Sequence, residues 1–168
     1  MDAPPADRPA FHDGRHAHQG CVADALARAE DVCRQRGARL TPLRRRVLEL
    51  VWDSHRAVKA YDLLAALGET AGAAKPPTVY RTLEFLMEHG LVHRIDSLNA
   101  FVGCPQPGEG HSAQFLICGD CGEVSEMNAA SIDRAVADRA ADSGFALSRA
   151  IIELHGKCSQ CATPPQSG

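Results

Sequence analysis

Two Cys-x-x-Cys pairs in the C-terminal half of this 168-residue chain have the spacing that most clearly predicts chemistry. Their four thiols belong to Cys118, Cys121, Cys158 and Cys161. Each pair forms a tight hook that aims two sulfurs at one point, and four thiolates are the usual ligands of a tetrahedral structural zinc. We therefore expect one Zn²⁺ bound by all four cysteines, which joins two segments distant in sequence.

A redox pair of the thioredoxin kind is the alternative interpretation of the first hook. Such a pair opens a helix after a buried strand. Here Gly122 and residues 124–127 follow the hook, a pattern typical of a turn and a strand. A redox function would also leave the second pair, at matching spacing, unexplained. The pattern therefore favours structural zinc.

The composition is that of a globular protein without a membrane span. Hydrophobic residues make up 45% of the chain, and no run approaches the roughly 18 apolar residues of a membrane helix. The first twenty residues are polar and contain three prolines, unlike a signal peptide. We expect a cytoplasmic location, where thiols stay reduced and can bind metal.

The net charge of −3 is unevenly distributed along the chain. Residues 21–104 carry slightly more basic than acidic side chains, whereas residues 105–168 carry twice as many acidic as basic ones. This asymmetry suggests two domains with different partners.

Four helices are expected in the first half of the chain, because apolar residues recur there at helical spacing. The fourth has the clearest signals. Pro76 and Pro77 mark its start, Val79 and Leu83 belong to its buried face, and Gly90 can end it. A β-hairpin should follow, with strands at residues 91–95 and 100–102. Helices followed by a hairpin describe a winged helix, a relative of the helix-turn-helix fold.

Beyond a segment rich in proline and glycine, the pattern predicts a small α/β domain. Its expected strands lie at residues 113–117, 124–127 and 146–154, with a helix near 130–142. The predicted fold class is α+β. The expected parts are a disordered tail (1–20), a winged-helix DNA-binding domain (21–104), a hinge (105–110), a dimerisation and metal-binding domain (111–161) and a second tail (162–168).

The fourth helix offers candidate nucleic-acid contacts. In a helix-turn-helix protein the first turns of the recognition helix reach the base edges. Arg81 could donate two hydrogen bonds to a guanine, and Tyr80 could pack on a thymine methyl group or a phosphate. A solvated helix face is the alternative. The expected DNA-binding residues are Thr78, Tyr80, Arg81, Thr82 and, within the arginine run 44–46, Arg44.

The chain resembles the ferric uptake regulator family at residues 39–44, 60–64 and 77–83 and at the two Cys-x-x-Cys pairs. The resemblance covers about residues 21–161. Within the family, residues 75–81, 144–147 and 155–158 look most like the zinc uptake regulators. The resemblance implies a homodimeric, metal-dependent repressor with an N-terminal winged helix and a C-terminal dimerisation domain. It also departs from many members, because no histidine-rich segment precedes the first hook.

A sensor needs a second, weaker metal site, since structural zinc should stay bound when zinc is scarce. The candidate ligands straddle the hinge, and the resemblance supports the same four: His93, Cys104, His111 and Glu126. One thiolate, two imidazoles and one carboxylate suit zinc. Each residue also has an ordinary alternative, such as a buried apolar thiol for Cys104.

These expectations combine into one function and several rivals. The chain is expected to be a zinc-dependent repressor of zinc-uptake genes, not an enzyme. It should bind a pseudo-palindromic operator in double-stranded DNA as a homodimer. Zinc would act as co-repressor by closing the hinge, with one structural and one regulatory Zn²⁺ per protomer. The alternatives are an iron- or peroxide-responsive regulator of the same family, or a Cys-x-x-Cys redox protein.

Overall fold

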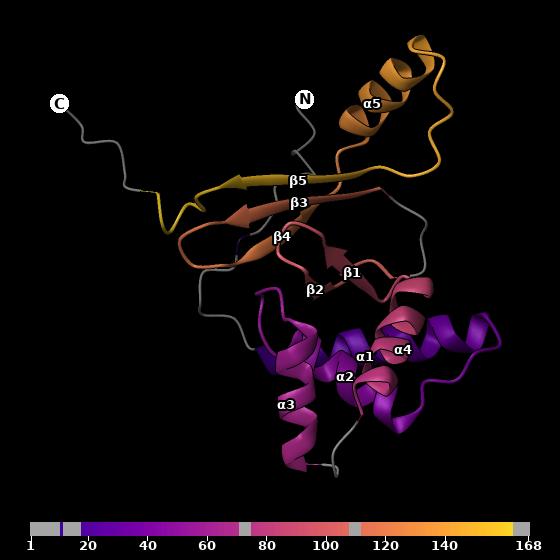
Figure 1. The fold of residues 1–168 in the computed structure, drawn as a ribbon, viewed down its shortest axis with the longest axis vertical. Coiled ribbons are helices and arrows are strands. Elements are labelled where there is room, and N and C mark those ends of the chain that lie inside the picture. Colours follow the sequence, from indigo (N-terminus) through magenta and orange to yellow (C-terminus); the bar gives the residue numbers. More distant parts are fainter. Residues whose placement is uncertain (1–10, 12–17, 71–74, 108–111, 163–168) are drawn as a thin grey trace, which may run out of the picture. The chain divides into compact units, whose positions relative to one another are not determined.

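The structure, a computed structural model, describes residue 11 and residues 18–70, 75–107 and 112–162. Two compact units form, one of residues 14–110 and one that contains residues 111–168 (Figure 1). The predicted tails fall largely outside the described residues, as does the end of the predicted hinge. Within the described ranges, every helix is too short or too polar to cross a membrane.

The unit of residues 14–110 is built around its second helix. Its elements are α1 (His18–Gln35), α2 (Pro42–Trp52), α3 (Ala60–Thr70), α4 (Pro76–Glu88), β1 (Val92–Ile95) and β2 (Ala100–Gly103). Helix α2 packs against α1, α3, α4 and β2. It buries Val47, Leu48 and Val51, which lie on one face at helical spacing. This arrangement has the order of elements expected of a winged helix.

Local signals set the ends of these helices. Thr41 is the N-cap of α2, where its side chain accepts a hydrogen bond from the Arg44 N–H, and Pro42 follows at the first helical position. Gly90 ends α4 with a φ of 67°, a conformation that glycine adopts without strain. Helix α1 begins at His18, so the expected boundary of the tail at residue 20 is wrong. Once a helix has formed, each added residue gains a backbone hydrogen bond and costs little free energy, so α1 can extend into the segment expected to be a tail.

The wing is an antiparallel hairpin of β1 and β2. His93 lies opposite Val102, and Val92 lies opposite Gly103. Val58 adds a short bridge on the other side of β2, with its N–H and C=O both bonded to Phe101 at 2.8 Å. These bonds tie the hairpin to the segment between α2 and α3. The wing therefore packs with the helices in one hydrophobic core, to which it contributes Val92 and Phe101.

The unit of residues 111–168 contains a three-stranded sheet and one helix. Its elements are β3 (Ala113–Cys118), β4 (Val124–Met127), α5 (Ala130–Asp142) and β5 (Ile151–Gly156), with strand order β4-β3-β5. Strand β3 is central, antiparallel to β4 and parallel to β5. The prediction of a strand over 146–150 is wrong, because the ladder of β5 begins where Ala113 pairs with Ile151.

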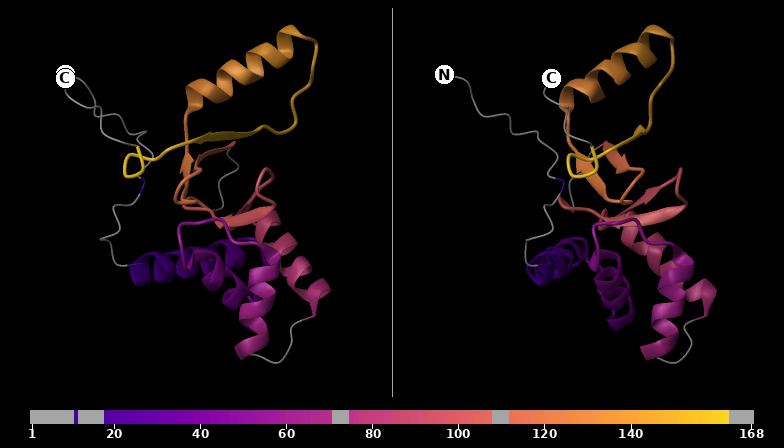
Figure 2. Two further views of the ribbon diagram at one scale, coloured as in Figure 1. Left: turned by 60° about the vertical axis from the view of Figure 1, so that its left-hand side comes forward. Right: turned by 90° about the vertical axis from the view of Figure 1, so that its left-hand side faces the viewer.

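Helix α5 stands away from the sheet, and none of its residues is buried (Figures 1 and 2). One buried side chain attaches its start to β3. The Gln114 Nε2 group donates to the Ala129 carbonyl oxygen at 3.1 Å and to Asp133 Oδ1 at 2.6 Å. A buried amide with these acceptors anchors the first turn of α5, whereas no other helix or strand among the described residues of this unit covers the rest of the helix.

Candidate metal centre and nucleic-acid interface

The two cysteine hooks emerge from neighbouring strand ends. Cys118 is the last residue of β3, and it pairs with Gly156 at the end of β5. Because β3 and β5 are parallel, their C-terminal ends lie at the same edge of the sheet (Figure 1). The Sγ atoms of Cys118, Cys121, Cys158 and Cys161 all lie within 4.8 Å of one another. The predicted convergence of the four thiols is therefore present.

Backbone hydrogen bonds hold the hooks in this arrangement. The Gly119 N–H donates to the Gly156 carbonyl oxygen at 2.9 Å, and the Cys158 N–H donates to Cys118 Sγ at 3.3 Å. Gly122, with a φ of 75°, turns the chain back from the first hook. Lys157 and Asp120, one from each hook, form an ion pair of 3.0 Å. The hooks are thus joined by contacts that do not involve a metal.

The geometry of the thiol cluster fits zinc. Zinc–sulfur bonds of about 2.3 Å in a tetrahedron place the sulfurs about 3.8 Å apart. Cys121 Sγ and Cys158 Sγ, which belong to different hooks, lie 3.8 Å apart. Four thiolates leave no position open for a water molecule, which is typical of a structural site.

The thiols differ in acidity. The backbone N–H groups of Cys121 and Cys158 point at the Cys118 sulfur and lower the pKa of that thiol to about 6. The pKa of Cys161 is raised to about 12, chiefly by its hydrogen bond with the Cys158 side chain and then by burial. At neutral pH Cys118 is therefore a thiolate before any metal binds, whereas Cys161 keeps its proton until a bound metal displaces it.

Two of the predicted regulatory ligands lie side by side on the wing. Cys104 comes directly after β2, two residues beyond Val102, which is opposite His93. Side chains two residues apart on a strand share a face, so the two side chains are diagonal neighbours. A ring nitrogen of His93 and the Cys104 thiol lie within 4.8 Å. Cys104 is 2% exposed, which suits a ligand or a buried apolar thiol.

The other two predicted ligands belong to residues 111–168. Glu126 is half-buried on β4, opposite Phe115 of the central strand. His111 lies outside the described residues. The four-ligand regulatory site therefore stays a prediction.

Helix α4 presents part of the predicted DNA-binding set. Thr78, Tyr80 and Arg81 are exposed, and Tyr80 is 51% exposed despite its size. The expectation that Thr82 shares this face is wrong. Thr82 is 6% exposed and its hydroxyl donates to the Thr78 carbonyl oxygen at 2.9 Å, because it lies three residues after Val79 on the buried stripe.

The arginine run of α2 is held by contacts within the unit. Arg44 lies over the Phe85 ring, 3.4 Å from its centroid, and donates to the Arg39 carbonyl oxygen at 2.6 Å. Arg45 forms ion pairs with Glu30 and Glu49, and Arg46 pairs with Glu49 as well. Arg44 thus stacks on the helix that carries Tyr80 and Arg81, an arrangement that sequence spacing did not predict.

Tyr61 is a candidate contact that the sequence analysis missed. It lies at the start of α3 and is 78% exposed, more than any other large hydrophobic side chain in the described ranges. The available signal was periodicity, since Leu63 and Leu67 define the buried stripe of α3 and Tyr61 falls outside it.

Comparisons with known proteins agree on one family. The profile of the Ferric uptake regulator family matches residues 35–155. The chain is 45% identical to the Zinc uptake regulation protein of Escherichia coli (strain K12) over 141 residues. This alignment covers 82% of this chain and 81% of that protein. Its fold is similar to that of a zinc uptake regulator complexed with zinc and DNA, with a TM-score of 0.78, 44% identity, and coverage of 83% of this chain and 94% of that one. It is also similar to the holo form of XcZur, with a TM-score of 0.76, 40% identity, and coverage of 86% and 98%.

Proposed function

The chain belongs to the ferric uptake regulator family, and from that premise we propose that it is a zinc-dependent repressor of zinc-uptake genes. The observation that carries this proposal is that a ring nitrogen of His93 and the thiol of Cys104 lie within 4.8 Å of each other on the wing of a winged helix. The chain is also similar to zinc uptake regulators. Its function is transcription regulation and not catalysis. The cytoplasm, where DNA is accessible and thiols are reduced, is the proposed compartment.

We assign two zinc ions to each protomer, with different roles. The four-cysteine cluster has a complete tetrahedral set and hooks joined by backbone bonds, so it retains its metal and stabilises the fold. The regulatory site consists of His93, Cys104, His111 and Glu126. Its mixed donor set binds zinc less tightly than four thiolates, which lets occupancy follow the available zinc.

Cys104 is the residue that favours zinc over the rival effectors. Iron and manganese sites favour nitrogen and oxygen ligands and more of them, whereas a thiolate with two imidazoles and a carboxylate suits four-coordinate zinc. An iron- or peroxide-responsive regulator of the same family is the alternative. A redox role for the Cys-x-x-Cys pairs is disfavoured by the sulfur geometry, which fits a single tetrahedral metal.

Coupling between metal and DNA follows from the division of the ligands between the two units. His93 and Cys104 belong to the DNA-binding unit, and His111 and Glu126 belong to the other. Ligation by all four favours the arrangement of units that binds DNA, and DNA must raise zinc affinity by the same factor. Shifting a population from mostly inactive to mostly active requires about 5 kcal/mol of differential binding.

We propose that α4 is the recognition helix. Arg81 reads a base edge, Tyr80 and Thr78 contact bases or phosphates, and Tyr61 extends the interface from the start of α3. Arg44 supports the interface indirectly, because its stacking on Phe85 holds α4 in position against α2.

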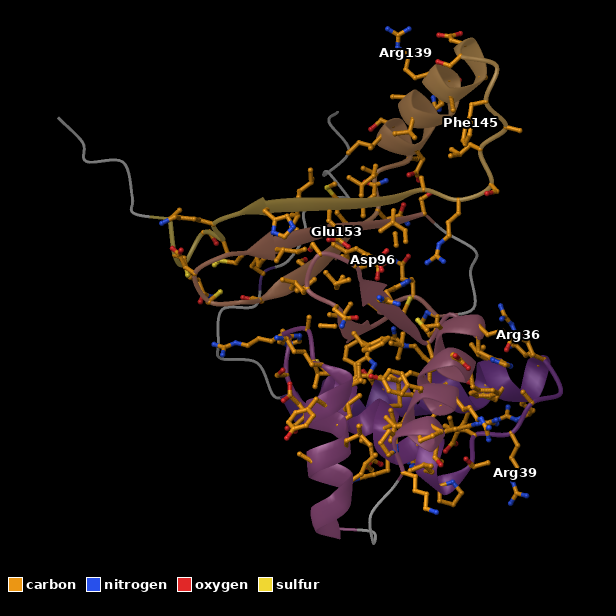
Figure 3. All side chains as sticks on the ribbon, viewed as in Figure 1. Arg36, Arg39, Asp96, Arg139, Phe145 and Glu153 are labelled. Atoms are coloured by element: carbon orange, nitrogen blue, oxygen red, sulfur yellow. The ribbon has the colours of Figure 1, made fainter. Side chains whose placement is uncertain are left out.

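A homodimer presents two recognition helices to a pseudo-palindromic operator. Support for a dimer comes from apolar side chains that the unit of residues 111–168 leaves exposed. Phe145, labelled in Figure 3, is 64% exposed on the segment after α5, and Leu147 and Leu154 are 39% and 43% exposed. Strand β5 is also an edge of its sheet. Such surfaces are covered in stable proteins, and a second copy is the covering partner proposed here.

The decisive experiment measures DNA binding across buffered free zinc. The wild-type protein should bind the promoter of a zinc-uptake gene only above a threshold of free zinc. Cys104→Ser should not bind this DNA at any concentration of free zinc, while the protein remains folded and retains one zinc. Equal DNA binding with and without available zinc, or a threshold that responds to iron instead, would contradict the proposal.

A further inference from the structure

We infer that Arg28 is a positioning residue for the zinc-sensing site, because it holds the backbone immediately after Cys104. The inference rests on the proposed function, in which Cys104 is a zinc ligand. Arg28 lies on α1, and its guanidinium donates a hydrogen bond of 2.6 Å to the carbonyl oxygen of Pro105. The bond joins the first helix of the unit to the segment that follows the wing, 77 positions later in sequence.

Cys104 is held from both sides by this arrangement. On its N-terminal side, the Cys104 N–H donates to the Leu91 carbonyl oxygen at 3.0 Å, which continues the β1–β2 ladder by one residue. On its C-terminal side, Pro105 has no N–H and cannot donate to the ladder. The bond from Arg28 supplies an anchor for the Pro105 carbonyl. With the peptide groups on both sides fixed, the direction of the Cys104 Cα–Cβ bond is set toward His93.

Preorganisation gives this anchor a functional consequence. A metal ligand that already points at its partner loses less conformational freedom when the metal binds. A guanidinium is also a suitable anchor, because it stays charged at any physiological pH and its bonds to carbonyl oxygens are stronger than those between neutral groups. Arg28 therefore tunes the zinc concentration at which the sensing site fills, without touching the metal.

Arg34 provides a matched control on the same helix. It is an exposed arginine whose ion pair with Asp31, at 2.8 Å, lies within α1. A general effect of removing an arginine from α1 should appear in Arg34→Ala as well as in Arg28→Ala. An effect on Cys104 should appear only in Arg28→Ala.

The test is a zinc titration of the full-length protein against a competing chelator. The variants are Arg28→Ala, Arg28→Lys and Arg34→Ala. In Arg28→Ala the dissociation constant of the second zinc equivalent should rise by up to about tenfold, because zinc must then order the backbone next to Cys104 that Arg28 otherwise orders in advance. The first equivalent should bind as before. With Co²⁺ in the second site, the thiolate-to-cobalt absorption should weaken. Arg28→Lys should restore part of the affinity, and Arg34→Ala should match the wild type.

The possible outcomes separate the two proposals. If the wild-type protein binds a single zinc equivalent, the sensing site itself is wrong. If it binds two and Arg28→Ala binds the second as tightly as the wild type, the positioning role of Arg28 is wrong and the proposed function stands. A lower melting temperature with unchanged second-site affinity would likewise overturn the inference, because Arg28 would then only stabilise the fold.

Discussion

Cys118 and Cys161 belong to one cluster, yet their thiols differ widely in acidity. Backbone N–H groups lower the pKa of Cys118 to about 6, and a hydrogen bond with Cys158 contributes most to raising that of Cys161 to about 12. The ordinary value is 9.0 for both. Zinc binding to thiols releases protons, so this difference has a measurable consequence.

Zinc binding to the metal-free four-cysteine site should release fewer than four protons at about pH 7.5, because Cys118 is already a thiolate there. At about pH 5.5, below the lowered pKa, Cys118 carries a proton and the number released should rise toward four. Calorimetric titration with zinc in buffers of different protonation enthalpy measures this number. Cys104→Ser, which removes a proposed ligand of the second site, isolates the contribution of the four-cysteine site. Equal release at both pH values would contradict the assignment of a thiolate to Cys118.

Arg81 is the residue whose loss should most alter sequence recognition. Arg81→Ala should weaken binding to the operator by roughly 1–3 kcal/mol and relax the preference at one base pair, since the proposed bidentate contact to guanine would be lost. Fluorescence anisotropy with the operator and its single-base variants measures both effects. Arg139→Ala is the control, because Arg139 is exposed on α5 and pairs with Asp142. Unchanged affinity and specificity in Arg81→Ala would remove Arg81 from the interface.

At the scale of elements, the wing depends on close packing against α2. Gly103 ends β2, and a Cβ atom added there would meet the ring of Trp52, the last residue of α2. The glycine is required by the close approach of an aromatic ring, since its φ is not in the left-handed region. Cys104 follows directly, so the contact also fixes where the wing delivers this proposed ligand.

Gly103→Ala should therefore destabilise the unit of residues 14–110 by about 1–3 kcal/mol, the usual cost of overpacking. Urea denaturation followed by the fluorescence of Trp52, the single tryptophan, measures the change. Gly68→Ala is a matched control, because Gly68 lies within α3 with open space around it. That substitution should be neutral or stabilise by up to about 1 kcal/mol. Equal stability of the two variants would mean that the wing can shift away from Trp52 freely.

At the scale of the whole molecule, the exposed apolar side chains after α5 predict the oligomeric state. Phe145→Ser combined with Leu147→Ser should raise the dimer dissociation constant by at least about tenfold, because apolar burial in the proposed interface is lost. Sedimentation equilibrium measures the constant. Tyr61→Ser, which removes an exposed aromatic side chain from the other unit, should leave the dimer intact and weaken DNA binding. A wild-type monomer, or a variant that dimerises as well as the wild type, would contradict the interface.

The sequence by itself determined the features that depend on local spacing. The Cys-x-x-Cys hooks, the stripe of Val79 and Leu83 on α4, and the hairpin around residues 96–99 follow from short-range geometry, because turns and helical periodicity are properties of neighbouring residues. The same reasoning failed where a partner from elsewhere decided the outcome. Residues 146–150 are predicted to begin the last strand, but the ladder of β3 with β5 begins at Ile151.

Tertiary structure alone decided how side chains with similar local signals are used. Thr82 looked like a surface residue of α4 until the packing against α2 and α3 showed which side of the helix is buried. The prediction that Arg44 contacts DNA could not foresee that Arg44 stacks on Phe85, and no local signal showed that Arg28 reaches Pro105 across 77 positions. Such contacts join residues far apart in the chain, and no local period encodes them. The sequence could therefore predict which side chains are candidate zinc ligands, whereas only the fold reveals which residues contact the backbone around them.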